Sequence, residues 1–315
     1  MSENESKSEY DRCPACNSNE WMFVREGGDL ARPEFKKSFE LTRCSSCGHV
    51  IQNPKPDERE LDAAYSDSKG YAAYRAAWTQ SGWPLWKILR AWTMHRRISW
   101  LKRYGTGREL LEVGCGAGDF MMAAHRAGWN VRAVEFNRRM VEMIVGKFGF
   151  DVRVGGLASC LWNEGQFDVV AFWNVLEHVP DPLRDLSIAA NYLRPGGRVF
   201  LGIPTRQAAE HGQWFGQYWA ILDLPRHLNF YNETTLSQLC GKVGFDLIVY
   251  KTPFVQTAWC YYMSSWNYAN RDGKKRMRWL RFIALAAVVT LYLPCIAVQT
   301  MRKHGTEAVA VLVKR

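Results

Sequence analysis

The sequence predicts an α/β protein with a doubly wound, mostly parallel seven-stranded sheet behind a small cysteine-rich module. Three observations support this fold class. From Glu109 onward, short apolar segments of strand length alternate with amphipathic segments of helical length. A glycine-rich turn follows the first of these segments, and two Cys-x-x-Cys pairs lie before residue 50.

We expect three parts along the chain. Residues 1–55 show few helical signals and end in the proline-punctuated stretch NPKPDE. Residues 56–104 should form a helical linker or cap, because apolar residues recur there at helical spacing. Residues 105–315 should contain the sheet, with an apolar helical insertion at about 260–303 between strands six and seven.

The seven strands are expected at 109–113, 130–136, 151–154, 167–172, 198–203, 246–250 and 307–313. Helices should fall between them, for example at 138–148 and 234–243. The seventh strand should run antiparallel to the sixth. In such a sheet a ligand binds at the carboxyl ends of the strands.

Composition narrows the class of protein. The chain has 315 residues, 47% of them hydrophobic, which is enough for one large core and an appendage. Its first dozen residues are polar, so we expect no secretory signal and a cytoplasmic location. Nine cysteines in such a chain favour reduced thiols and metal ligands over disulfides.

The formal net charge of +10 is concentrated in two segments, 83–108 and 251–281. Segments of this kind attract phosphates of nucleic acid, of anionic lipid or of a phosphorylated substrate. A solvated helix face would explain either segment equally well.

The turn after the first strand contains Gly114, Gly116 and Gly118, which let the backbone turn sharply and a ligand approach closely. Asp119 stands where a dinucleotide-binding fingerprint has its third glycine, which disfavours a pyrophosphate ligand. Glu135 ends the second strand, where an acidic residue accepts hydrogen bonds from ribose hydroxyls.

The segments LLEVGCGAGDF, AVEF, FDVVAFWNVLEHVPDP and LRPGGRVFLGIP resemble, in order, the motifs of class I S-adenosylmethionine-dependent methyltransferases. The resemblance covers Glu109 to about Tyr250 and implies a Rossmann-like fold with S-adenosylmethionine as cofactor. It implies that the glycine turn surrounds the methionine moiety, that Glu135 holds the ribose and that Gly156 and Leu157 lie near the adenine. The cofactor-binding residues expected from it are Glu112, Gly114, Cys115, Gly116, Gly118, Glu135, Phe136, Gly156, Leu157 and Asn174.

Methyl transfer to oxygen also needs a base. His178, on the loop after the fourth strand, is the first candidate, and His227 in DLPRHLNFY is the second. The Glu177-His178 pair is similar to the ExxEH element of ubiquinone-biosynthesis O-methyltransferases, which the resemblance would link to a divalent metal. Asn174 replaces the first Glu of that element, so we predict no catalytic metal.

The paired cysteines Cys13, Cys16, Cys44 and Cys47 can supply four thiolates to a structural zinc ion. This spacing predicts a zinc-ribbon-like module. Similar ribbons precede methyltransferase cores that act on polysaccharides, lipids, natural products and ribosomal RNA, so the module leaves the substrate open.

Residues 282–298 carry no charge and follow the basic run RDGKKRMRWLR. As a helix they would span about 26 Å, slightly less than the hydrocarbon core of a bilayer. Because the seventh strand must return to the sheet, we expect an interfacial segment or a short re-entrant hairpin, with a break at Pro294. The protein should then associate peripherally with the inner face of the membrane. A buried core or dimer-interface helix is the alternative.

Together these features predict an S-adenosylmethionine-dependent methyltransferase that modifies an oxygen of a hydrophobic or lipid-linked small molecule at a membrane surface. Amino-group methylases of nucleic acid bases usually resemble one another in an NPPY-type tetrapeptide after the fourth strand. This sequence has WNVLEH there instead, so nucleic acid is a less favoured partner. The alternatives are a soluble enzyme acting on a nucleotide-linked sugar, an RNA methyltransferase and an inactive binding module.

Overall fold

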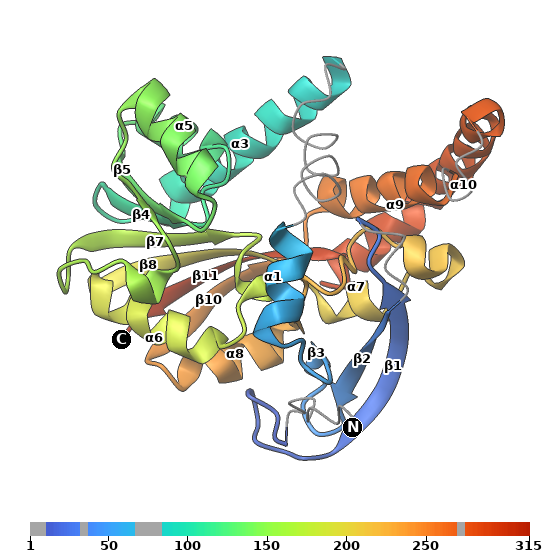
Figure 1. The fold of residues 1–315 in the computed structure, drawn as a ribbon, viewed down its shortest axis with the longest axis horizontal. Helices are drawn as coiled ribbons and strands as arrows, with labels where there is room; N and C mark the ends of the chain where they lie inside the picture. Colours follow the sequence, from blue (N-terminus) through green and yellow to red (C-terminus); the bar gives the residue numbers. More distant parts are fainter. Residues whose placement is uncertain (1–10, 32–36, 67–83, 270–274) are drawn as a thin grey trace. The chain divides into compact units, whose positions relative to one another are not determined.

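The computed structural model describes residues 11–31, 37–66, 84–269 and 275–315 (Figure 1). The chain divides into two compact units. The sheet unit comprises Thr79–Gly202, Ser237–Val249 and Ala310–Arg315, and the ribbon unit comprises Met1–Trp78, Ile203–Leu236 and Tyr250–Val309. This division cuts across the three predicted parts, because the ribbon unit takes in segments from far along the chain.

Seven strands form one sheet in the order β10-β11-β8-β7-β4-β5-β6 (Figure 1). They are β4 (Glu109–Val113), β5 (Asn130–Glu135), β6 (Val152–Val154), β7 (Phe167–Trp173), β8 (Leu193–Pro204), β10 (Phe245–Lys251) and β11 (Glu307–Lys314). The helices of this part are α3 (Pro84–Tyr104), α4 (Asp119–Arg126), α5 (Arg138–Phe148), α6 (Pro182–Tyr192) and α8 (Glu233–Gly241), with short 3-10 turns η1 (Leu157–Ser159) and η2 (Leu176–His178). Neighbours from β6 across to β8 pair in parallel, so the predicted fold class is confirmed.

β11 runs antiparallel to both of its neighbours. The N–H of Arg315 donates to the carbonyl of Gly244, just before β10, at 3.0 Å. The Nζ of Lys314 donates to the carbonyl of Leu193, the first residue of β8, at 2.8 Å. The end of β11 therefore lies at the start of each neighbouring strand, as the sequence predicted.

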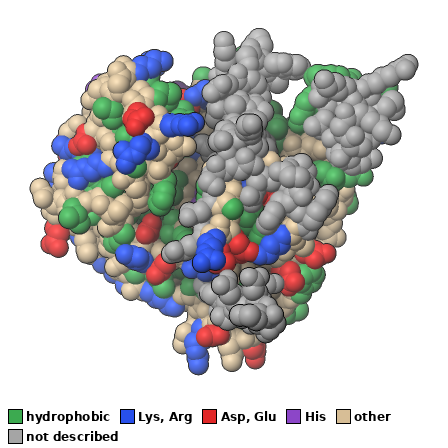
Figure 2. Space-filling model, in the orientation of Figure 1, with side chains coloured by type: hydrophobic (Ala, Val, Ile, Leu, Met, Phe, Trp, Pro, Cys, Tyr) green, Lys and Arg blue, Asp and Glu red, His purple; other side chains and the backbone are tan. Residues whose placement is uncertain are grey.

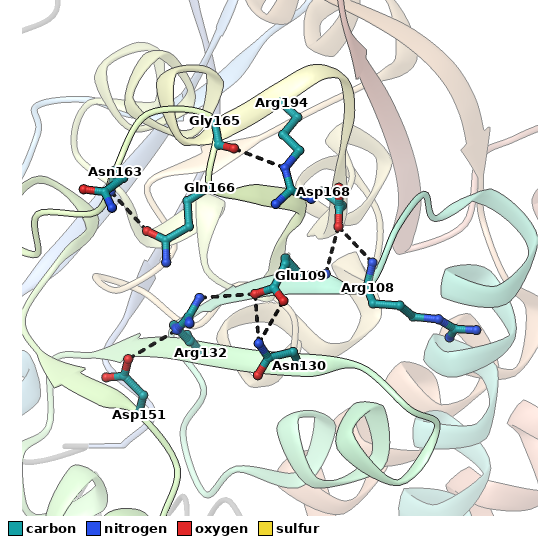
Figure 3. Close-up of polar contacts among 10 residues, drawn as sticks. All are labelled: Arg108, Glu109, Asn130, Arg132, Asp151, Asn163, Gly165, Gln166, Asp168 and Arg194. Atoms are coloured by element: carbon teal, nitrogen blue, oxygen red, sulfur yellow. Dashed lines mark hydrogen bonds and ion pairs between the residues drawn. The ribbon is translucent and has the colours of Figure 1, made fainter.

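Polar contacts hold the amino edge of the central strands together (Figure 3). Asp168 on β7 accepts hydrogen bonds from the backbone N–H groups of Arg108 and Glu109, at 2.8 and 2.9 Å, and from Arg194 at 2.6 Å. The carboxylate of Glu109 accepts from Asn130 at the start of β5. Because these contacts lie at the amino edge, the opposite carboxyl edge is left for a ligand.

The ribbon unit has a four-stranded sheet in the order β1-β2-β3-β9. Its strands are β1 (Trp21–Gly28), β2 (Ser38–Cys44), β3 (Val50–Gln52) and β9 (Asn229–Phe230), and its helices are α1 (Glu58–Ser66), α7 (Arg206–Glu210), η3 (Gln213–Tyr218), α9 (Phe254–Ala269) and α10 (Lys275–Met301). Phe39 and Leu41 of β2 share one apolar core with Trp219, Tyr261 and Ile296. Strand β2 of the cysteine-bearing ribbon therefore packs on later segments of the same unit.

α10 packs antiparallel to α9, since Tyr262 contacts Thr290 through their hydroxyls at 2.8 Å while Trp266 contacts Trp279. The prediction of a break at Pro294 is wrong, because α10 runs unbroken through it. A proline inside a helix costs about 3 kcal/mol, and the buried Val289 and Ile296 on either side of it hold the helix against the core.

One helix in the described part of the chain, Trp279–Met301, is long and apolar enough to cross a membrane by length and composition, and 11% of its most apolar window is buried. Hydrophobic side chains are exposed on the side of the molecule where α10 lies (Figure 2). A core helix of this chain would be mostly buried, so α10 does not fit a buried core helix. The basic residues Arg271 and Lys274 lie outside the described residues.

Candidate active site

The glycine-rich turn after β4 forms a backbone cradle at the carboxyl edge of the sheet. Gly114, Gly116 and Gly118 have φ angles of 69°, 54° and 79°, a region that favours glycine. A Cβ on Gly114 would lie 2.6 Å from the Cγ2 of Val175. Both conformation and space therefore require glycine at position 114.

Glu135, at the end of β5, lies beside this turn. Its Oε2 accepts a hydrogen bond from the N–H of Gly116 at 2.8 Å, and its Oε1 accepts from the N–H of Asn137 at 2.9 Å. The next side chain, Phe136, is 82% exposed and lies against Gly156. An oriented carboxylate beside an exposed aromatic ring can hold a ribose and an adjoining base.

Leu157 and Cys115 of the predicted cofactor set are buried. The side chain of Leu157 is packed in the core, so only its backbone can face a ligand. Cys115 is buried in the turn, and burial raises the pKa of its thiol, with the charges of Glu112 and Glu135 adding to the shift. Its role is therefore to shape the turn rather than to react.

Glu112 is a buried carboxyl group at the end of β4. Burial raises its pKa to about 8; the charge of Arg97 opposes this shift, and the charges of Asp119 and Glu135 add to it. Among the described residues, its Oε2 has no hydrogen-bond partner. A buried acceptor without a partner costs free energy, so this atom is suited to receive a cationic or N–H group of a ligand.

Arg97 of α3 is a site residue that the sequence did not reveal. Its Nη2 donates to the Oδ1 of Asn174 at 2.9 Å, and its guanidinium lies 4.7 Å from the centre of the Trp173 ring. Seven residues earlier on the helix, Arg90 donates through Nε to Asp119 at 2.7 Å. A spacing of seven residues places both arginines on one helix face. This spacing was the feature of the sequence that could have indicated that both arginines face the sheet unit.

Two arginines of the basic segment around α3, Arg90 and Arg97, thus already have partners in the sheet unit. Arg96 also lies over Trp92, at 4.9 Å from the ring centre. Asn174 itself adopts a left-handed conformation, with φ 59°, and its N–H donates to the carbonyl of Gly202. This geometry turns the chain sharply after β7, at the carboxyl edge.

The two candidate bases belong to different units. His178 ends η2 in the sheet unit, next to the fully buried Glu177, and is itself partly buried. His227 belongs to the ribbon unit and is buried. Burial lowers the pKa of His227, and the charge of Asp223 partly opposes this effect.

The hydrogen bonding of His227 defines its tautomer. Its Nδ1 lies 2.7 Å from the carbonyl oxygen of Ile221. A carbonyl can only accept, so Nδ1 must carry the proton and Nε2 of the neutral ring has a lone pair. Nε2 lies 4.0 Å from Oδ2 of Asp223, which is too long for a hydrogen bond. The ring is thus held in the form that a general base needs.

A family model described as a methyltransferase domain matches residues 89–250, just over half of the chain. The chain belongs to the S-adenosylmethionine-dependent methyltransferases. It is similar to the ubiquinone biosynthesis O-methyltransferase of Ralstonia nicotianae, 32% identical over 120 residues that cover 36% of this chain and 50% of the relative. The enzyme of the same name from Xanthomonas campestris pv. campestris (strain B100) is 30% identical over 164 residues, which cover 50% of this chain and 68% of the relative.

Solved structures share the fold. The [4+2]-cyclase SpnF matches with a TM-score of 0.55 and 16% identity, over 82% of this chain and 97% of that one. Haemonchus contortus Phospholethanolamine N-methyltransferase 2 matches with a TM-score of 0.50 and 18% identity, over 93% of this chain and 68% of that one. At these identities the likeness extends to the fold alone.

The four cysteines of this methyltransferase's ribbon converge as predicted. All four sulfur atoms lie within 4.8 Å of one another, with Cys13 and Cys47 at 3.6 Å and Cys16 and Cys44 at 3.5 Å. Tetrahedral zinc with bonds of ~2.3 Å needs sulfur–sulfur distances of roughly 3.8 Å. The cluster therefore fits a structural zinc ion.

Proposed function

We propose that this methyltransferase transfers a methyl group from S-adenosylmethionine to a hydroxyl oxygen of a hydrophobic small molecule. The observation that carries the proposal is the tautomer of His227: its Nδ1 lies 2.7 Å from the carbonyl oxygen of Ile221 and donates to it, so in the neutral ring Nε2 is the nitrogen that would accept the hydroxyl proton. The relatives named ubiquinone biosynthesis O-methyltransferase support oxygen as the acceptor atom.

Three residues of the sheet unit support the binding of S-adenosylmethionine. The partnerless Oε2 of Glu112 suits the amine of the methionine moiety, Arg97 suits its carboxylate, and Glu135 suits the ribose hydroxyls. When bound, S-adenosylmethionine supplies an electrophilic methyl group, so that a C–O bond forms as the C–S bond breaks. The chain's own contribution is alignment of donor and acceptor, which is worth roughly 7–11 kcal/mol of the barrier, and removal of the hydroxyl proton.

Association with a membrane surface is the second part of the proposal. The outer face of α10 carries Leu280, Ile283, Val288, Leu291 and Val298, all exposed, along almost its whole length. The helix is followed by Arg302 and Lys303, and the sequence has Lys275, Arg276 and Arg278 at its start. An apolar stripe between basic ends favours the interface of an anionic bilayer on the cytoplasmic side.

The charged start of α10 argues against insertion of the α9–α10 hairpin with its tip first. Each Lys or Arg at the centre of the bilayer would cost about 2.5–3.5 kcal/mol. β10 and β11, which flank the hairpin in sequence, belong to one sheet, so the chain must also return to the side that it left. We therefore propose that α10 lies along the membrane plane, where a hydrophobic acceptor molecule can be taken from the bilayer.

Activity is tested with purified protein, S-adenosylmethionine and a panel led by a catechol with a short prenyl chain. We expect protein-dependent methylation of the catechol and formation of S-adenosylhomocysteine. His227→Gln should lower kcat by about 10²- to 10⁴-fold without changing cofactor affinity, and His178→Gln is the matched variant. If only His178→Gln is inactive, His178 is the base. If a nucleotide-linked sugar is methylated instead, the hydrophobic acceptor is wrong.

A further inference from the structure

A buried ion cluster joins the ribbon to the loop that carries His227. The side chains of Arg226 and Asp29 are fully buried. Arg226 donates to both carboxylate oxygens of Asp29, at 2.8 and 3.1 Å, and through Nε and Nη2 to Oδ1 of Asp223, at 2.9 and 2.7 Å. Asp29 directly follows β1, whereas Asp223 and Arg226 flank a turn of the 221–230 loop.

The same loop is held by the ribbon at its other end. The N–H of Gln52 on β3 donates to the carbonyl of Leu228 at 2.9 Å. Ile51 of β3 pairs with Asn229 of β9, and the imidazole of His49 lies 3.4 Å from the Asn229 side chain. Residues 221–230 are thus fixed on both sides of His227 by residues that precede them by 176 to 197 positions.

A buried arginine between two carboxylates is costly to break and contributes little net stability compared with apolar residues of the same size. Its value therefore lies in geometry. The planar guanidinium binds two carboxylates in fixed directions, which a lysine could not do. Because Asp223 receives two of these bonds, its other oxygen is oriented toward Nε2 of His227.

We propose that the ribbon is the scaffold of the catalytic loop and that Arg226 is a positioning residue, anchored on Asp29, that fixes Asp223 and through it His227. The inference rests on the proposed role of His227 as the base. In that role the hydroxyl proton passes to Nε2, the ring becomes an imidazolium, and the Asp223 carboxylate at 4.0 Å stabilises the new positive charge.

Two conservative variants, Arg226→Lys and Asp29→Asn, test this inference by amide hydrogen exchange and kinetics. Exchange within 221–230 should become roughly ten- to a hundredfold faster, as the loss of a charge-assisted hydrogen bond allows. With the prenylated catechol, kcat should fall at least about tenfold while KM stays within about twofold. The affinity for S-adenosylmethionine, measured by calorimetry, should not change.

Arg43→Gln is the matched control, because Arg43 pairs with Glu210 of α7 at 2.9 Å, within the same unit but outside the loop. It should leave exchange in 221–230 and kcat unchanged. If a conservative variant does not fold, Asp29→Leu with Arg226→Met replaces the pair by apolar groups and should still show the faster exchange.

Native-like exchange in 221–230 in the folded variants would overturn the inference, as would an equal effect of Arg43→Gln. Full activity of His227→Gln would instead refute the base assignment, and the exchange data would still decide whether the cluster fixes the loop.

Discussion

Replacing Glu112 by Gln tests the proton balance of cofactor binding. Burial raises the pKa of this carboxyl to about 8 from 4.5, with Arg97 opposing the shift and Asp119 and Glu135 adding to it. The difference corresponds to roughly 5 kcal/mol in favour of the protonated form. At pH 7 most chains without cofactor should therefore carry this proton.

An ammonium group beside Glu112 favours its ionised form, so binding of S-adenosylmethionine at pH 7 should release most of one proton per chain. Because deprotonation must accompany binding, affinity should increase with pH below about pH 8. Calorimetry in two buffers of different ionisation enthalpy measures the release. In Glu112→Gln, proton release should vanish and binding should weaken by about 1.5–3 kcal/mol. Equal proton release by the native protein and Glu112→Gln would refute this reasoning.

Three further predictions follow from particular contacts. Asp168→Ala should lower the free energy of unfolding by about 2–3 kcal/mol in urea denaturation, since two part-buried backbone N–H groups lose their charged acceptor. Asp246→Ala, at an exposed pair, is the control and should change the free energy of unfolding by less than about 0.5 kcal/mol. Burial lowers the pKa of His227 and the neutral ring is the base, so kcat should increase with pH through a midpoint below pH 6.5 and then reach a plateau. A midpoint above pH 6.5 would exclude His227 as the base. Leu291→Glu on α10 should abolish flotation with anionic liposomes, whereas Leu161→Glu, at a similarly exposed residue of the sheet unit, should not. A membrane role for α10 is contradicted if both variants float, or if neither the variants nor the native protein float.

The strands and the glycine-rich turn after β4 could be predicted because their signals are local. Gly114, Gly116 and Gly118 follow an apolar strand within a few residues, and α5 occupies the expected residues 138–148. The position of Glu135 at the end of a strand was predicted in the same way. In each case the sequence neighbours of a residue are also its structural neighbours.

Arg97 and the Asp29–Arg226 pair were missed because their partners are distant in sequence. A basic helix looks the same whether its arginines face solvent or a buried carboxyl such as Glu112. β9 is only two residues long, so no periodic pattern marks it, and its pairing with β3 depends on tertiary structure. Pro294 was misjudged for the same reason, because packing of α10 on α9 overrides the local preference to break the helix.

Mass spectrometry of a single reaction tests the proposed function most directly. Purified protein is incubated with S-adenosylmethionine and a detergent-dispersed bacterial lipid extract, and the organic and aqueous phases are compared with those of a Glu135→Ala control. We predict that a compound in the organic phase gains one CH₂ unit on oxygen, with an equal amount of S-adenosylhomocysteine formed, and that the control shows neither product. Methylation confined to water-soluble compounds, or no S-adenosylhomocysteine above the control, would contradict methyl transfer to a hydrophobic hydroxyl acceptor.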